Sequence, residues 1–232
     1  MIITIHQPEF LPYMGFFDRL ASADIFIALD NVGYEKNGFV NRNRIKTRAG
    51  LEYITVPVLG RSPKKKIDEI LIDNTQEWQR SLLGKIKASY ASSPFFRDYF
   101  PFFEDAFYKK WGKISDLDIY LIENLGELLG MNLKIERASL NKVAGKKTER
   151  LVNICKEFKA KTYLSGPGGK DYMDLDLFKN AGIEVVFQDF SQAEYNQQFS
   201  EKGFLPNMSI IDLMFNEGKN SLAIIKSGNK KL

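Results

Sequence analysis

The first chemically suggestive stretch is the turn that carries the only histidine of the chain. The apolar run Ile2–Ile5 is followed directly by His6 and Gln7. A histidine titrates near neutral pH, so it can act as a general acid or base or can stabilise developing phosphate charge. We therefore identify His6 as a candidate catalytic group and Gln7 as a candidate for orienting substrate. The alternative is a structural histidine that bonds to backbone at the end of a strand.

A second polar constellation follows in residues Asn31–Gly50, which carry no apolar period and are expected to form a long loop. Long ordered loops are often functional. Closely spaced amides and guanidinium groups suit phosphates, carboxylates or sugar hydroxyls. The candidate binding residues are Tyr34, Lys36, Asn41, Arg42, Asn43 and Lys46. A solvated surface loop is the alternative.

A third constellation is the glycine-rich stretch SGPGGKDY, which follows a predicted strand and opens a predicted helix. Glycines permit close approach of backbone to a ligand, and a helix N-terminus favours an anion. The stretch matches neither GxGxxG nor the phosphate loop of nucleotide hydrolases, so a sharp turn is the alternative. The candidate binding residues are Ser165, Gly166, Gly168, Gly169 and Lys170.

A fourth stretch, Phe204–Gly218, places Pro206 and Asn207 before a predicted amphipathic helix that begins near Ser209. The structural interpretation is a capped helix that docks on the core. Asn207 is the candidate binding residue here.

These residues need a scaffold, and the first part of it is a strand–helix–strand unit. Residues 2–5 and the apolar run Ile25–Asp30 are predicted strands, with a helix over 16–23 between them. Such a unit pairs its strands in parallel. His6 and Asp30 would then both lie at carboxyl ends of strands, where open α/β sheets bind ligands, so Asp30 is a further candidate.

The remaining pattern predicts a strand over 53–58, then a helical block, then a second α/β stretch. The block at about 75–130 contains helices over 76–90, 95–107 and 115–129, with a kink or break at Pro101. Asn74 or Thr75, Ser115 and Thr148 are expected helix caps. The second stretch is predicted as strands over 132–139, 161–166 and 183–190 and helices over 148–159 and 171–182.

Together these elements predict an α/β fold with a mostly parallel, Rossmann-like sheet and a helical insertion or subdomain. We expect one α/β domain over residues 1–232, with the helical subdomain at about 75–130.

The composition is that of a globular protein, with 44% hydrophobic and 27% charged residues and a formal net charge of +4. Short lysine runs at 64–66 and 142–147 come without a nucleic-acid motif, so we expect no nucleic-acid binding. The positive balance favours an anionic or sugar-containing small molecule. We expect no signal peptide and no membrane span, and a cytoplasmic location.

The single cysteine, Cys155, excludes an internal disulfide and fits the apolar face of a helix. One histidine and one cysteine do not make a typical zinc site, so no metal site is predicted. The residues do not identify a cofactor or an oligomeric state.

Four segments together resemble the WbqC-like protein family: IHQPEFLPYMGFFDRLASADIFIALD, NRNRIKTRAGLEYITVPV, YLSGPGGKDYMDLDLFKNAGIEVVFQDF and FLPNMSIIDLMFNEG. The resemblance spans nearly the whole chain and implies a place in lipopolysaccharide, O-antigen or related bacterial glycan biosynthesis. The opening turn is also similar to that of nucleotidyltransferase-like α/β folds. Those folds carry a second histidine in an HxGH-type motif, where this chain has Tyr13-Met14-Gly15.

The residues and the resemblance together predict a transferase that acts on a nucleotide-linked or amino sugar. Acyl or aminoacyl transfer to an amino sugar fits as well as phosphoryl-centred chemistry. A non-catalytic protein that binds a sugar nucleotide or a partner of the same pathway is the alternative.

Overall fold

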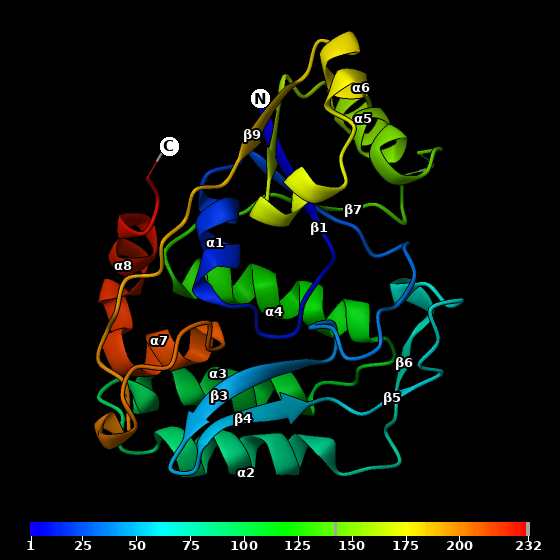
Figure 1. The fold of residues 1–232 in the computed structure, drawn as a ribbon. Coiled ribbons are helices and arrows are strands. Elements are labelled where there is room, and N and C mark those ends of the chain that lie inside the picture. Colours follow the sequence, from blue (N-terminus) through cyan, green and yellow to red (C-terminus); the bar gives the residue numbers. More distant parts are fainter. Residues whose placement is uncertain (142, 231–232) are drawn as a thin grey trace.

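The computed structural model describes residues 1–141 and 143–230, so Lys142 of the second lysine run lies outside the described residues. Within them, a five-stranded sheet forms the upper half of the molecule in Figure 1, and all its strand pairs are parallel. Its strands, in order across the sheet, are β7 (Ile135–Arg137), β2 (Ile25–Ala28), β1 (Ile2–His6), β8 (Thr162–Ser165) and β9 (Glu184–Phe187). The predicted α/β fold with a mostly parallel, Rossmann-like sheet is confirmed.

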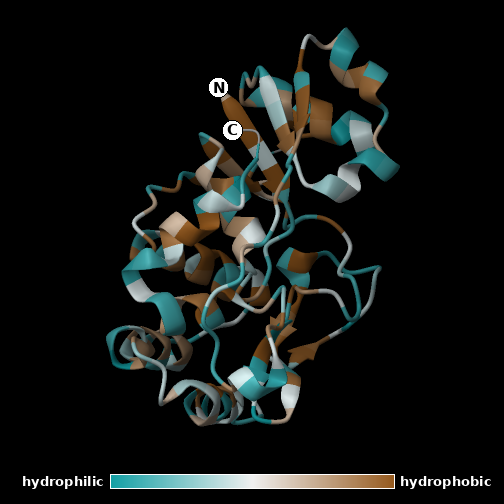
Figure 2. Ribbon diagram, turned by 60° about the vertical axis from the view of Figure 1, so that its left-hand side comes forward, coloured by the Kyte–Doolittle hydropathy of each residue, from teal (hydrophilic) through white to brown (hydrophobic). Residues whose placement is uncertain are grey.

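The sheet is covered on both faces, which explains why its strands are nearly continuous apolar runs (Figure 2). On one face, Ile3 and Ile5 pack against α5 (Lys147–Glu157) and α6 (Leu175–Asn180). Cys155 is buried in this layer, and burial raises the pKa of its thiol to about 12.

On the opposite face, Phe26 and Ala28 of β2 join a larger apolar cluster with α1 (Met14–Ala21) and α4 (Ile114–Leu128). That cluster continues into a lower layer (Figure 1), which is built from α2 (Trp78–Tyr90), α3 (Phe96–Tyr108) and α7 (Ile210–Glu217). Helix α8 (Ser221–Ser227) lies higher in Figure 1, packs against α1 and joins the same cluster through Ile225. The predicted helical block therefore exists, and its core is continuous with one face of the sheet.

The segment predicted as a long polar loop contains a strand, so that prediction was wrong. Strand β3 (Arg42–Thr47) pairs antiparallel with β4 (Gly50–Thr55), and the hairpin packs on α2. Two of the buried positions in β3 are Asn43 and Lys46, so polar side chains hide the apolar alternation that marks a strand.

The strand predicted over 53–58 is interrupted around Pro57. Strand β4 ends at Thr55, and the short β5 (Val58–Leu59) pairs with β6 (Leu71–Ile72) in a separate two-stranded sheet. Proline has no N–H to donate to a ladder, which accounts for the break.

Several predicted helix ends also differ from the structure. The N-cap positions are Glu77, Lys113 and Lys146, so Asn74, Thr75, Ser115 and Thr148 cap none of these helices. The Thr148 hydroxyl instead accepts a hydrogen bond from the backbone N–H of Asp174.

Pro101 lies inside α3 without breaking it. Both Pro101 and Arg97, whose carbonyl loses its helical partner, are exposed to water, which can supply the missing hydrogen bond.

Across the described ranges, no helix combines the length and apolar character needed to cross a membrane.

Candidate functional site

The centre of the candidate site is the gap between the carboxyl ends of β1 and β8. These strands are neighbours in the sheet, but after β1 the chain moves to β2 on one side, and after β8 it moves to β9 on the other. Such a topological switch point opens a crevice where α/β proteins bind ligands. His6 and Ser165 end the two strands and line one cavity there.

Two adjoining cavities, of about 280 and 420 Å³, occupy this position and share Ile5, His6, Glu9, Tyr163 and Tyr172. We call the pair the switch-point groove. Its combined size suits a small-molecule substrate. Of the predicted residues, the groove collects His6, Gln7, Ser165, Gly166, Gly168 and Gly169. Their functional roles stay predictions.

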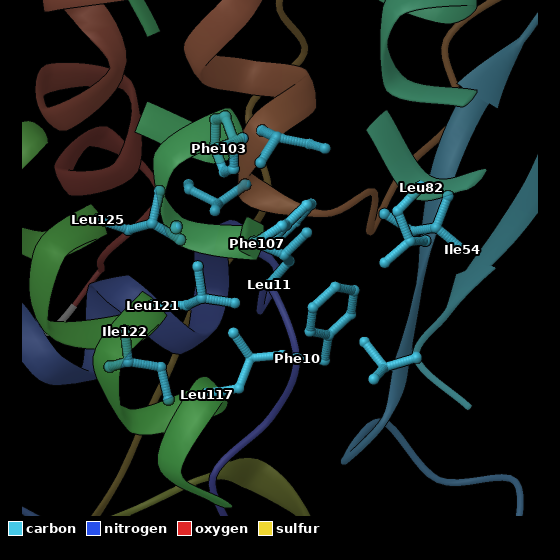
Figure 3. Close-up of a cluster of buried hydrophobic side chains, with 14 of the residues drawn as sticks. Phe10, Leu11, Ile54, Leu82, Phe103, Phe107, Leu117, Leu121, Ile122 and Leu125 are labelled. Carbon is cyan, nitrogen blue, oxygen red and sulfur yellow. The ribbon is translucent and has the colours of Figure 1, made fainter. Parts of the chain in front are cut away.

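The loop between β1 and α1 is held rigidly over this groove. Phe10 and Leu11 of this loop are buried in the core among side chains of α3, α4 and the hairpin (Figure 3). The side-chain amide of Asn43 donates to the carbonyls of Phe10 and Leu11 at 3.0 and 2.8 Å. The hydroxyl of Ser209 donates to the Leu11 carbonyl at 2.9 Å. Glu9 therefore lies in an anchored loop, which begins directly after His6 at the end of β1.

The imidazole of His6 has a defined tautomer. Its Nδ1 lies 3.0 Å from the backbone carbonyl oxygen of Gln7, which can only accept a hydrogen bond. Nδ1 therefore donates, and Nε2 holds the free lone pair. The ring also packs edge-on against Phe16, with the centroids 5.6 Å apart. The His6 side chain is 38% exposed, and its partial burial and the positive charge of Arg19 both lower its pKa, so the neutral form of the ring predominates at pH 7.

Glu9 is the second titratable group of the groove. Its Oε1 atom lies 3.7 Å from Nδ1 of His6, and its side chain is 14% exposed. Burial raises the pKa of Glu9 to about 7, although Arg19 and Arg44 act in the opposite direction. Near neutral pH the groove thus combines a neutral imidazole with a carboxyl group that exchanges protons readily.

Arg19 supplies a buried positive charge. It is 3% exposed, and its guanidinium donates to the side-chain carbonyl of Gln188 at 3.2 Å. None of the ion pairs found in residues 1–141 and 143–230 includes Arg19, and its Nε has no hydrogen-bond partner there. Since Arg19 lines the groove, it is suited to balance the charge of an anionic ligand.

The glycine-rich turn packs closely around these groups. A Cβ on Gly166 would lie 2.9 Å from the Arg19 guanidinium, and one on Gly169 would lie 2.3 Å from Oγ of Ser165. Glycine at both positions therefore allows the turn to close beside the groove. The turn does not open a long helix as predicted: residues Pro167–Asp171 form a 3-10 turn, and α6 starts later with Asp174 as its cap.

Lys170 of the same turn is placed differently. Its side chain is exposed, its Nζ lies 5.3 Å from the ring centroid of Phe187, and it lines neither cavity of the groove.

Most of the other predicted binding residues hold the hairpin and its surroundings together. The Tyr34 hydroxyl donates to Asn41, and the Asn41 amide donates to the Val56 carbonyl. Arg42 bonds to the carbonyls of Asn37 and Gly38. Tyr34, Asn41 and Arg42 themselves line neither cavity of the groove, although Asn37 and Gly38, the partners of Arg42, line one of them.

The side chains of Lys46 and Asp30 also form hydrogen bonds with residues outside the groove. The Lys46 ammonium donates to the Gly203 carbonyl at 2.7 Å. The Asp30 carboxylate accepts from the backbone N–H and the hydroxyl of Ser139 at 2.8 and 2.7 Å. Lys36 is exposed and lines neither cavity of the groove.

Asn43 and Asn207 line a smaller neighbouring pocket, together with Arg44. Arg44 belongs to the NRNRIK segment, but sequence reasoning did not select it. Residues missed in the groove include Glu9, Tyr13, Arg19, Tyr163 and Tyr172. Two of them had a usable signal: Glu9 lies three residues after His6, and Arg19 interrupts the otherwise apolar face of a short helix.

The chain is similar to known proteins over almost its whole length. The model of the WbqC-like protein family matches residues 7–224. A relative from Mycobacterium tuberculosis (strain ATCC 25618 / H37Rv), "Uncharacterized protein Rv1507c", is 33% identical over 219 residues, which cover 93% of this chain and 94% of the relative. No solved structure matches the chain. The extent of the family match shows that this chain belongs to the WbqC-like protein family.

Proposed function

We propose that the protein is a transferase that acts on a nucleotide-linked or amino sugar in bacterial surface-glycan biosynthesis. The observation that carries the proposal is the contact between His6 and Glu9, 3.7 Å apart, in a groove that also contains Arg19. Environments that shift the pKa values of neighbouring titratable groups are typical of acid–base catalysis. The resemblance to the WbqC-like family supports the pathway.

Glu9 is the proposed general base. A substrate hydroxyl or amine would pass its proton to the Glu9 carboxylate as its oxygen or nitrogen forms the new bond to the transferred group. The bond between that group and the leaving group breaks, and the leaving group keeps the bonding electrons. The neutral His6, whose Nε2 is an acceptor, would hold a second hydroxyl or amine of the substrate in position.

Arg19 is the proposed anchor for negative charge on the donor or the leaving group. A nucleotide-linked sugar carries its charge on phosphates, and guanidinium groups bind phosphate oxygens in a bidentate manner. Tyr172 is exposed and lines both cavities of the groove, so its ring is available to stack on a sugar or base.

A non-catalytic protein that binds a sugar nucleotide is the second candidate. Arg19 and the glycine-rich turn favour it, since both serve binding without requiring any chemistry.

The test begins with a thermal-shift screen of nucleotide sugars, nucleoside triphosphates and acyl carriers. A ligand that binds only the folded state raises the melting temperature, and silence across the nucleotide sugars would count against the proposal. Positive ligands are then incubated with candidate acceptors, and products are followed by mass spectrometry.

The decisive comparison uses three variants of the active protein. Glu9→Gln should lose about 10²-fold or more in turnover while ligand binding is retained. His6→Ala should also lower turnover, because the group that positions the acceptor is lost, while binding of the nucleotide part of the donor is retained. Glu157→Gln removes an exposed carboxylate at the end of α5 and should behave as wild type. Ligand binding without any turnover in the wild-type protein would favour the non-catalytic alternative.

A further inference from the structure

A smaller cavity lies against the switch-point groove, on the side of the hairpin. Its volume is about 130 Å³, and its lining residues are Glu9, Tyr13, Phe39, Asn43, Arg44 and Asn207. We call it the Arg44 pocket. Glu9 and Tyr13 line both it and the groove, so these two side chains form the partition between them.

Arg44 brings a positive charge to this pocket, and the only carboxyl group that lines the pocket with it is Glu9, whose raised pKa of about 7 leaves it partly protonated at neutral pH. The Nε of Arg44 is buried and has no hydrogen-bond partner, and the ion pairs found in the described ranges do not include Arg44. The guanidinium carbon lies 5.0 Å from the ring centroid of Phe39, which leaves the planar edge of the group available to a ligand. A buried donor of a charged group is costly to leave unsatisfied, so a bound anion is the expected partner.

The backbone around Arg44 is fixed. Its N–H donates to the side-chain carbonyl of Asn43 at 2.8 Å, and its carbonyl accepts from the backbone N–H of Ser209 at 2.8 Å. The pocket is thus held between the hairpin and the start of α7, and it does not depend on a mobile arginine on an open surface.

Asn207 adds a polar group at the rim. Its backbone N–H donates to the side chain of Gln192 at 2.9 Å, and its φ of 57° places it in the left-handed region that asparagine tolerates. Within the part of the chain that the structure describes, no hydrogen bond holds its side-chain amide, which can therefore reach a ligand. Asn43 is different, because its amide is already committed to the loop carbonyls.

We propose that the Arg44 pocket binds a small carboxylate of about amino-acid size. A guanidinium edge matches the planar carboxylate in a bidentate manner. The volume corresponds to about four waters, which admits a few heavy atoms and excludes a nucleotide. Phe39 and Tyr13 supply aromatic walls for the short carbon chain. A role for this ligand as the second substrate rests on the proposed function, whereas its binding does not.

The binding test uses the full-length protein and four probes: acetate, glycolate, pyruvate and glycine. Titrations are followed by ¹H–¹⁵N NMR, including the arginine side-chain Nε–H signals. In the wild-type protein, at least one carboxylate should shift the Arg44 signal saturably, with a dissociation constant of about 1 mM or below. This wild-type measurement stands even if a variant fails to fold.

Two variants test the residue itself. Arg44→Gln should weaken carboxylate binding about tenfold or more, because a charge-assisted pair is lost. Arg48→Gln removes an exposed arginine from the turn of the same hairpin and should change binding by less than about twofold. Equal weakening in both variants, or no saturable shift of the Arg44 signal with any carboxylate, overturns the proposal. So does tighter binding of inorganic phosphate than of every carboxylate.

The same proteins separate this proposal from the proposed function. If carboxylates bind at Arg44 while no nucleotide sugar is turned over, the proposed Arg44 pocket is supported and the proposed transferase function is not. If turnover occurs and Arg44→Gln changes neither turnover nor the binding of any small carboxylate, the proposed transferase function is supported and the proposed Arg44 pocket is not.

Discussion

The Nδ1 atom of His6 lies 3.7 Å from the Oε1 atom of Glu9, at the switch point of the parallel sheet. Glu9 lies in the loop that follows His6, the last residue of β1, yet the surroundings move the two pKa values in opposite directions: burial raises that of Glu9 and lowers that of His6. Each shift favours the uncharged form. Because these pKa values differ between the folded and unfolded states, the free energy of unfolding depends on pH.

The first prediction concerns the pH dependence of stability in Glu9→Gln. The ordinary pKa of the Glu9 carboxyl is 4.5, and its pKa in the folded protein is about 7. Between these two pH values, Glu9 binds its proton more tightly in the folded protein than in the unfolded chain. The wild-type protein therefore loses stability as the pH rises through this window. Glu9→Gln should escape that loss, so its advantage should grow with pH and level off above about 7, at up to roughly 3 kcal/mol.

Urea unfolding at pH 4.5, 6 and 8 measures this difference. His6 is untouched in the variant, and its own contribution, which rises with pH because its pKa is lowered, cancels between the two proteins. A pH-independent difference between Glu9→Gln and wild type would show that Glu9 titrates normally.

The second prediction compares two glycines of one turn. A Cβ at Gly169 would lie 2.3 Å from Oγ of Ser165 and 2.9 Å from Cε of Met173, whereas one at Gly168 meets nothing within 4 Å. Gly169→Ala should therefore destabilise the protein by about 1–3 kcal/mol and displace Ser165 at the groove. Gly168→Ala should stay within about 0.5 kcal/mol of wild type. Thermal unfolding of both variants decides, and equal effects would contradict the packing described for this turn.

The third prediction concerns the hydrogen bonds by which Asn43 of β3 holds the loop between β1 and α1. Its amide donates to the carbonyls of Phe10 and Leu11, and Asn43→Ala would leave both buried acceptors without this partner. We expect a loss of about 2–3 kcal/mol in the free energy of unfolding. Because the same loop carries Glu9 and begins directly after His6, ligand binding in the groove should weaken as well. Asn180→Ala, at the exposed end of α6, is the control, and Asn43→Ala with wild-type stability would refute the assignment.

The sheet could be predicted from the sequence because its strands are covered on both faces. The run Ile25–Ala28 is continuously apolar for that reason, and the polar residues that follow such runs mark the strand ends. Parallel pairing then places His6 and Ser165 at the same edge of the sheet, whereas the switch point between them depends on the strand order, which the sequence pattern did not give.

The NRNRIK segment shows why other parts could not be predicted. A buried Asn43 or Lys46 is satisfied by backbone carbonyls that lie more than thirty residues away in the chain, at Leu11 and Gly203. No local pattern records such partners, so a buried polar strand looks like a loop. The direction of Arg44 depends on the register of the hairpin, which the turn alone does not specify.

The last prediction compares the contributions of Arg19 and Lys170 to the binding of an anionic ligand. Arg19 is buried in the groove wall without an ion pair among the described residues, while Lys170 is exposed over Phe187. Arg19→Met should weaken binding of a nucleoside diphosphate by about 10- to 100-fold, because a charge-assisted contact is lost. Lys170→Met should change it by less than about threefold. Isothermal titration calorimetry measures both, and unliganded melting temperatures identify any loss of fold. Stronger weakening in Lys170→Met would move the anion site from the groove wall to the outer face of the glycine-rich turn.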